Sequence, residues 1–130
     1  MIAFDLDGVF IPDFEITEEN KEQILNIRNK TKPLFIPKGE YYIITGRPIE
    51  DEHDTLKWIE REFSDNPPIE IFIGAKTFND GIKFKEQILN QHKEITEYYE
   101  SDQNQCDYLN EKCKHDIIVY HFSSFIRGYL

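Results

Sequence analysis

Short apolar runs alternate with longer amphipathic segments along the whole chain. Five apolar runs have the length of β-strands: 2–6, 40–45, 69–74, 95–99 and 116–122. Four segments between them have helical spacing or helix-capping residues: 16–30, 49–63, 80–92 and 102–113. Thr17 and Asp80 stand where the N-caps of the first and third helices are expected. The alternation predicts an α/β fold: a three-layer α/β/α sandwich whose mostly parallel, five-stranded, Rossmann-like sheet carries helices on both faces.

Length and charge narrow this picture. The 130 residues suit a single domain, 1–130, and the 25 acidic against 15 basic residues give a net charge of -10. Such a surface repels bare polyanions and acidic membranes, although a bound divalent cation can reverse the sign locally. No apolar run is long enough to cross a bilayer and no signal peptide precedes the first strand, so we expect a cytoplasmic protein with no membrane partner. Cys106 and Cys113 are expected to be small buried hydrophobes in a reducing compartment.

Polar residues follow several of the predicted strands, at the sheet edge where α/β proteins bind ligands. Asp5 and Asp7 come after the first strand, and residue alternation predicts that both point to one face. The other candidates are Thr45, Gly46 and Arg47 after the second strand, Glu100 and Asp102 after the fourth, and Lys83 and Lys85 on the helix before it. We expect the acids to converge without a counter-charge, and therefore to bind Mg²⁺.

This set of residues suits phosphoryl transfer. A carboxylate can attack phosphorus to form an aspartyl-phosphate, while a second carboxylate moves the proton of the leaving group and of the water. Mg²⁺, a lysine and a hydroxyl group can neutralise the charge on the phosphoryl oxygens. Because Mg²⁺ prefers a few carboxylates together with waters, one acid from each of two strands is sufficient.

Four segments carrying these residues resemble the motifs of the haloacid dehalogenase-like (HAD) hydrolase superfamily, over essentially the whole chain. "FDLDGVF" (4–10) is similar to the first motif and is the most specific of the four. "YYIITGRP" (41–48), "IKFKEQIL" (82–89) and "YYESDQNQCDYL" (98–109) resemble the second, third and fourth motifs. The resemblance implies a phosphatase with Mg²⁺ as its cofactor.

The resemblance also implies roles for individual residues. Asp5 would be the nucleophile, Asp7 the acid/base, and Thr45 and Lys85 the phosphoryl binders. Mg²⁺ would be held by Asp5, the Asp7 carbonyl oxygen, and Glu100 or Asp102; the "ESD" order departs from the usual Gly-Asp or Asp-Asp and leaves these two open. For the third motif Lys85 is favoured over Lys83 and Lys76, because apolar residues follow it on the helix. Gly46, Arg47 and Lys83 complete the expected substrate-binding set.

The expected substrate follows from the gaps between strands, which are too short for the cap domain of many relatives. In this superfamily an open site is associated with bulky substrates or with closure by a partner subunit. The acidic charge balance argues against long polynucleotides, so we expect a phosphorylated small molecule or nucleotide. "ITGRP" before the helix with Trp58 also resembles, loosely, the phosphatase half of polynucleotide kinase/phosphatases. This resemblance adds short 3′-phosphorylated nucleic acid ends to the expected substrates.

The sequence argues against two other interpretations and leaves a third open. An EF-hand loop would need an acid at its twelfth position, which is Ile16, and a receiver domain would need an acid where the third strand ends at Gly74. The third, a catalytically weak or inactive binding module of the same fold acting through a protein partner, stays open.

Overall fold

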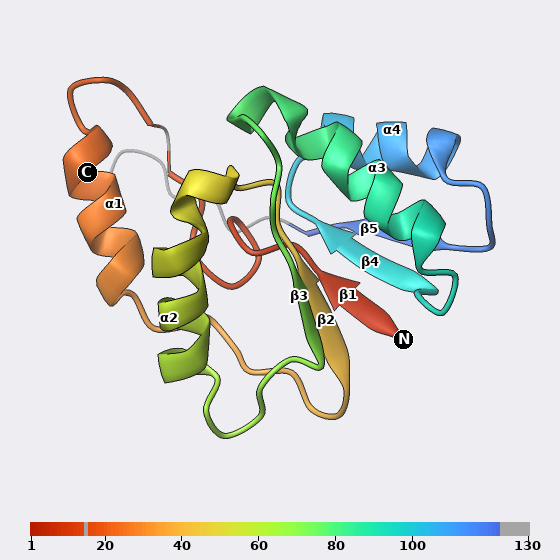
Figure 1. The fold of residues 1–130 in the computed structure, drawn as a ribbon, viewed down its shortest axis with the longest axis horizontal. Coiled ribbons are helices and arrows are strands. Elements are labelled where there is room, and N and C mark those ends of the chain that lie inside the picture. Colours follow the sequence, from red (N-terminus) through yellow and green to blue (C-terminus); the bar gives the residue numbers. More distant parts are fainter. Residues whose placement is uncertain (15, 123–130) are drawn as a thin grey trace.

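Five parallel strands form one sheet at the centre of the molecule (Figure 1). The computed structural model describes residues 1–14 and 16–122. The strands are β1 (Ile2–Phe4), β2 (Tyr41–Ile44), β3 (Glu70–Phe72), β4 (Glu97–Glu100) and β5 (Ile118–His121). Their order across the sheet is β3-β2-β1-β4-β5, and every pairing is parallel. The predicted α/β class and parallel sheet are therefore confirmed.

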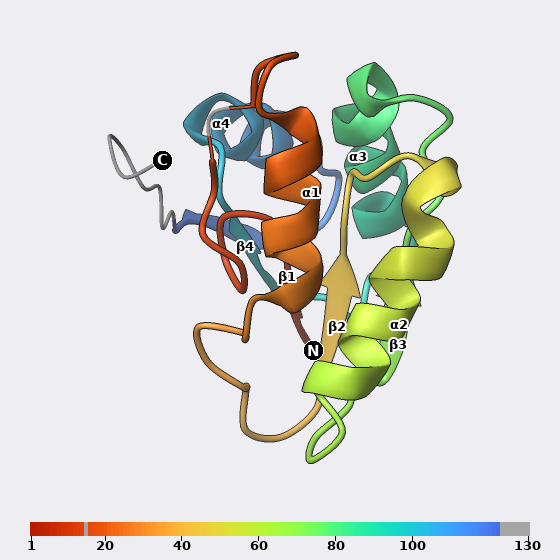
Figure 2. The ribbon, with the colours of Figure 1, turned by 90° about the vertical axis from the view of Figure 1, so that its left-hand side faces the viewer.

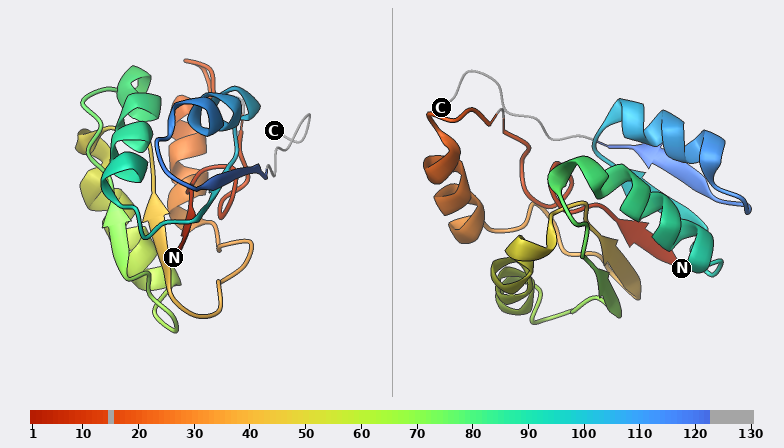
Figure 3. Two further views of the ribbon diagram at one scale, coloured as in Figure 1. Left: turned by 90° about the vertical axis from the view of Figure 1, so that its right-hand side faces the viewer. Right: turned by 45° about the horizontal axis from the view of Figure 1, so that its top comes forward.

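Four helices cover the two faces of this sheet. They are α1 (Lys21–Lys30), α2 (Glu52–Glu62), α3 (Gly81–Gln91) and α4 (Gln103–Lys112), with short 3₁₀ turns at Ile49–Asp51 and Phe78–Asp80. Helices α1 and α2 lie together on one side (Figure 2), and α3 and α4 lie on the other (Figure 3). The helices that connect the strands are placed as a parallel sheet requires.

Alternation along the strands divides the core in two. Tyr41 and Ile43 of β2 point to the side of α1 and α2, where they join a buried cluster with Trp58. Their neighbours Tyr42 and Ile44 point to the side of α3 and α4. A parallel sheet buried on both faces needs apolar residues at successive positions, which is why the strands read as continuous apolar runs.

One predicted helix cap is wrong, and the other is confirmed in position but not in its hydrogen bond. Helix α1 begins at Lys21, because Thr17 and Asn20 exchange hydrogen bonds between their side chains and backbone N–H groups and close a turn first. Asp80 is the N-cap of α3 but accepts a hydrogen bond from the Thr77 hydroxyl and not from the helix backbone. Thr17 is therefore not the cap that the pattern indicated.

The described residues contain no cap domain. The chain between β1 and β2 supplies a tight loop and α1, and the chain between β3 and α3 supplies a 3₁₀ turn. In the same part of the chain, no helix has both the length and the apolar character needed to cross a bilayer. The carboxyl edge of the sheet is thus framed only by its own loops and helix ends.

Gly8 shapes the loop directly after β1. Its φ of +84° lies in the left-handed region, and a Cβ at this position would lie 2.4 Å from Cβ of Ser101, in the turn after β4. The two loops at the edge of β1 and β4 can approach this closely only because residue 8 has no side chain.

We therefore expect Gly8→Ala to lower the free energy of unfolding by about 2–5 kcal/mol, since it combines left-handed strain with a steric overlap. Gly39→Ala is the matched control: its φ is +80° and nothing lies within 4 Å of the added Cβ, so strain alone should cost about 1–2 kcal/mol. Urea denaturation of the two variants measures the difference. Equal losses would show that the approach of the two loops is not tight.

Candidate functional site

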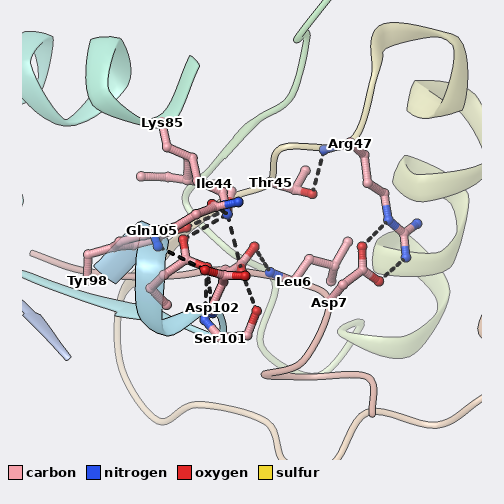
Figure 4. Close-up of polar contacts among 12 residues, drawn as sticks. Leu6, Asp7, Ile44, Thr45, Arg47, Lys85, Tyr98, Ser101, Asp102 and Gln105 are labelled. Atoms are coloured by element: carbon pink, nitrogen blue, oxygen red, sulfur yellow. Dashed lines mark hydrogen bonds and ion pairs between the residues drawn. The ribbon is translucent and has the colours of Figure 1, made fainter. Parts of the chain in front are cut away.

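Three neighbouring strands and one helix bring the predicted residues to the carboxyl edge of the sheet (Figure 4). Asp5 follows β1 directly, Thr45 follows β2, and Glu100 is the last residue of β4. Lys85 reaches the same edge from the middle of α3. All four residues are buried, with at most 4% of their surface exposed, and charged residues are rarely buried to this extent without partners.

Lys85 lies between two buried carboxylates. Its Nζ is 2.8 Å from Oε1 of Glu100 and 3.3 Å from Oδ2 of Asp5, and it also donates to Oε1 of Gln105 at 2.9 Å. Burial disfavours the charged ammonium, but Asp5 and Glu100 outweigh it and raise the pKa of Lys85. The lysine is therefore a fixed positive charge shared by β1 and β4.

Asp5 is a buried carboxyl group close to a second carboxylate, that of Glu100. Its Oδ1 accepts the backbone N–H of Leu6 at 2.8 Å, and its Oδ2 accepts the hydroxyl of Ser101 at 3.0 Å. Burial raises the pKa of Asp5 well above its usual range, Glu100 raises it further, and Lys85 opposes both. Two carboxylates share one ammonium, so this site has room for additional positive charge.

Glu100, the last residue of β4, and Asp102, in the turn after it, have different contacts. Glu100 holds Lys85 with Oε1, and its Oε2 accepts the backbone N–H groups of Ser101 and Asp102. Asp102 is exposed and is the N-cap of α4, where its Oδ1 accepts the N–H of Gln105 at 2.9 Å. Glu100 is thus committed through both oxygens, whereas the contacts of Asp102 within the described chain use one.

Asp7 is turned to a different partner from Asp5. Arg47 grips it with two hydrogen bonds, from Nη2 to Oδ1 at 2.6 Å and from Nε to Oδ2 at 2.8 Å. Arg28 of α1 approaches the same carboxylate, with Nε 3.5 Å from Oδ1. Burial alone would raise the pKa of Asp7, but Arg47, followed by Arg28 and Lys85, lowers it to about 2.

The expectation that the acids converge without a counter-charge is therefore wrong. Asp5 and Glu100 share Lys85, and Asp7 pairs with two arginines. The chain after Phe4 leaves the regular strand, so the simple alternation that would put Asp5 and Asp7 on one face does not apply there.

The remaining predicted residues divide in the same way. Thr45 lies between Lys85 and Arg47 (Figure 4), and its Oγ1 accepts the N–H of Arg47 at 3.2 Å. Gly46 packs against Gly81 at the start of α3, where an added Cβ would lie 3.1 Å from the backbone. Lys83 is not brought to the site: two residues from Lys85 on a helix, it points elsewhere and donates to the hydroxyl of Tyr108. Lys76 is exposed after β3.

Several contributing residues escaped the sequence reasoning. Ser101 and Gln105 touch Asp5 and Lys85, and Thr55 accepts a hydrogen bond from Nη1 of Arg47 at 2.9 Å. Ser101 could have been identified from the "ESD" segment, because it lies between the two candidate acids. Arg28 had no such signal, since it belongs to a polar helix far from every motif.

The fit to a divalent cation depends on few ligands. Within residues 1–14 and 16–122, no three His, Cys, Asp or Glu side chains form a group that could hold a metal on their own. Mg²⁺ is usually held by one or two carboxylates with waters and substrate phosphate, so a cage of three is not required. The raised pKa of Asp5 shows that positive charge is favourable beside it. The donors around Asp5 therefore fit a hard cation.

Comparisons with known proteins add no relative. The chain matches no model of a protein family, and no curated protein or solved structure is significantly similar to it.

Lys85 should be the residue on which the stability of this site depends most. We expect Lys85→Met to lower the free energy of unfolding by about 3–5 kcal/mol, because it leaves two buried carboxylates without their cation. The double variant Lys85→Met/Glu100→Gln should recover part of this loss. Urea denaturation is the measurement, with Lys83→Met on the exposed side of the same helix as control. A Lys85→Met protein as stable as the control would contradict the shared-charge description.

Proposed function

We propose that this chain is a Mg²⁺-dependent phosphomonoesterase of the HAD type, which works through an aspartyl-phosphate on Asp5. The observation that carries the proposal is the buried Asp5 carboxylate at the end of the central strand, held by Lys85. A carboxylate at the carboxyl edge of a parallel sheet, beside a fixed cation and close to the threonine that follows the neighbouring strand, suits nucleophilic attack on phosphorus.

In the first step, one oxygen of Asp5 attacks the phosphorus. The bond from phosphorus to the leaving oxygen breaks with its electron pair on that oxygen, which takes a proton from Asp7. Asp7 must first leave Arg47 and bind this proton from the solvent, because its pairing with the arginines lowers its pKa to about 2. Lys85 and the hydroxyl of Thr45 stabilise the charge on the phosphoryl oxygens. Asp5, now an acyl phosphate, has given up its own negative charge, and the lysine keeps the transferred group in place.

In the second step, a water attacks the phosphorus of the aspartyl-phosphate and gives a proton to Asp7. The bond between phosphorus and Asp5 breaks and inorganic phosphate leaves, which regenerates the Asp5 carboxylate and leaves Asp7 protonated. Asp7 releases this proton to the solvent when it pairs with Arg47 again. Bound Mg²⁺ would supply charge neutralisation for the phosphoryl oxygens. Asp5, the carbonyl oxygen of Asp7 and Asp102 would hold it, with Glu100 kept as the anchor of Lys85.

The substrate class follows from access and charge. An edge without a cap domain admits phosphate groups on varied small molecules, and a net charge of -10 opposes long polyanions beyond the site itself. We infer that the substrates are phosphorylated small molecules or nucleotides, including short 3′-phosphorylated nucleic acid ends. The cytoplasm is the proposed location.

The second candidate is an inactive binding module acting through a protein partner. The observation that favours it is the resting state of Asp7, which is bound to Arg47 through both oxygens. Turnover experiments separate the two candidates.

Asp5→Asn tests the nucleophile. We expect turnover of p-nitrophenyl phosphate and nucleoside monophosphates with millimolar Mg²⁺ to fall at least about 1,000-fold, because an amide cannot form the acyl phosphate. Phosphate release is the readout, and Asp107→Asn on the exposed face of α4 is the control. Activity within about tenfold of the unmodified protein, or about 1.4 kcal/mol of barrier, would eliminate the mechanism.

A metal titration tests the proposed ligands. We expect Mg²⁺ to raise the melting temperature by mass action, and Asp102→Asn to weaken that response while changing the metal-free melting temperature only by the loss of a helix cap. Glu100→Gln should instead lower the metal-free melting temperature, because Lys85 loses its closest partner. A melting temperature that ignores Mg²⁺ would argue against the site.

A further inference from the structure

Arg47 occupies both oxygens of Asp7 in the resting protein. Its two N–H···O contacts, at 2.6 and 2.8 Å, form the bidentate pair that a guanidinium makes with any planar or tetrahedral oxyanion. Nη1 of the same group donates to Thr55, which is fully buried. A carboxylate held in this way cannot approach a leaving group until Arg47 changes partner.

Arg28 is a second cation at the same point, and it is poorly satisfied. Its side chain is only 14% exposed, its Nε is buried without a hydrogen-bond partner, and its ion pairs with Asp7 and Asp13 are long, at 3.5 and 4.0 Å. Buried polar groups are almost always hydrogen-bonded, so an unpartnered guanidinium N–H calls for an explanation. This Nε is the atom that lies 3.5 Å from Oδ1 of Asp7, so an oxyanion that takes the place of the Asp7 carboxylate can accept the hydrogen bond that Asp7 does not complete.

The charges facing this pair limit what that ligand can be. Asp7 forms ion pairs with both arginines, and Asp13 forms one with Arg28. Asp51, in the 3₁₀ turn before α2, adds a negative charge that raises the pKa of Arg47. A neutral group or a weak acceptor would not compete with Asp7 for Arg47. An oxyanion with two or more oxygens and a full negative charge can, because it offers the same bidentate contact and also satisfies Arg28.

We propose that Arg28 and Arg47 form a subsite for a second oxyanion of the substrate, and that its binding draws Arg47 away from Asp7 and so frees the acid/base. This inference rests on the proposed phosphatase function, which it narrows to a substrate class. Asp5 and Asp7 are two residues apart, so their Cα atoms are separated by at most about 7 Å. One small molecule can therefore reach the phosphoryl site and the subsite together.

The substrates are then phosphomonoesters that carry a second phosphate or phosphodiester close to the scissile group. A nucleoside bisphosphate meets this description, and so does a short oligonucleotide end, where the neighbouring phosphodiester is the second anion. Both present the same chemistry to the arginines. The net charge of -10 repels a long polyanion, whereas the two arginines can bind one additional anion locally.

The test compares kcat/KM for four substrates: a nucleoside 3′,5′-bisphosphate, a dinucleotide 3′-phosphate, a nucleoside 3′-monophosphate and p-nitrophenyl phosphate. We expect the unmodified protein to prefer the two-anion substrates by at least about tenfold, and Arg28→Gln to reduce that ratio at least about tenfold. Arg28→Lys, which keeps the charge without the fork, should fall between them. Arg61→Gln, an exposed arginine on α2, is the control and should keep the ratio. No preference in the unmodified protein, or equal losses on all four substrates in Arg28→Gln, would overturn the subsite.

A binding measurement separates this inference from the proposed function. Calorimetric titration with methylenebisphosphonate, which carries two anionic groups and is not hydrolysed, should show binding that weakens at least about tenfold in Arg28→Gln. If no substrate is turned over but this loss is found, the phosphatase proposal fails and the subsite stands. If substrates are turned over and Arg28→Gln binds the bisphosphonate as the unmodified protein does, the subsite fails and the phosphatase proposal stands.

Discussion

The ammonium group of Lys85 is the contact on which the carboxyl edge of the sheet depends. It is the cation that balances Asp5 and Glu100, and it ties α3 to β1 and β4 at a place where the three charged groups are buried. Two buried carboxylates facing each other would otherwise have to bind protons or separate. The approach of the two loops at Gly8 and the cap at Asp102 are arranged around this shared charge.

The chain separates two acids of the same motif by giving them opposite surroundings. Burial and the Glu100 carboxylate raise the cost of the negative charge on Asp5, and Lys85 offsets only part of it, whereas Asp7 faces arginines that stabilise its charge. In the resting protein these shifts run against the proposed roles, since a nucleophile has to be ionised and a proton donor has to carry a proton. Additional positive charge beside Asp5 and the loss of Arg47 from Asp7 would reverse both shifts. The ion pair between Asp7 and Arg47 must open before Asp7 can transfer a proton.

The fold was predictable from the sequence because helices cover both faces of a parallel sheet, so that its strands read as local apolar runs, most clearly in the fully buried β2. The backbone positions of Asp5, Thr45 and Glu100 followed from the same logic, since strand ends meet at one edge. The partners of these residues were not predictable. Arg28 belongs to a helix that carries no motif. Thr17 forms a turn with Asn20 and does not cap the helix, because of two hydrogen bonds that the composition does not reveal.

The single tryptophan of the chain gives this arrangement an optical reporter. Trp58 of α2 is 2% exposed, and its indole N–H donates to the carbonyl oxygen of Thr31, the residue that ends α1. Indole emission depends on burial and on this hydrogen bond, so the fluorescence follows the docking of α1 against α2. Because α1 also carries Arg28, the emission wavelength would register any displacement of the helix that delivers the second arginine, without a label and without a reaction.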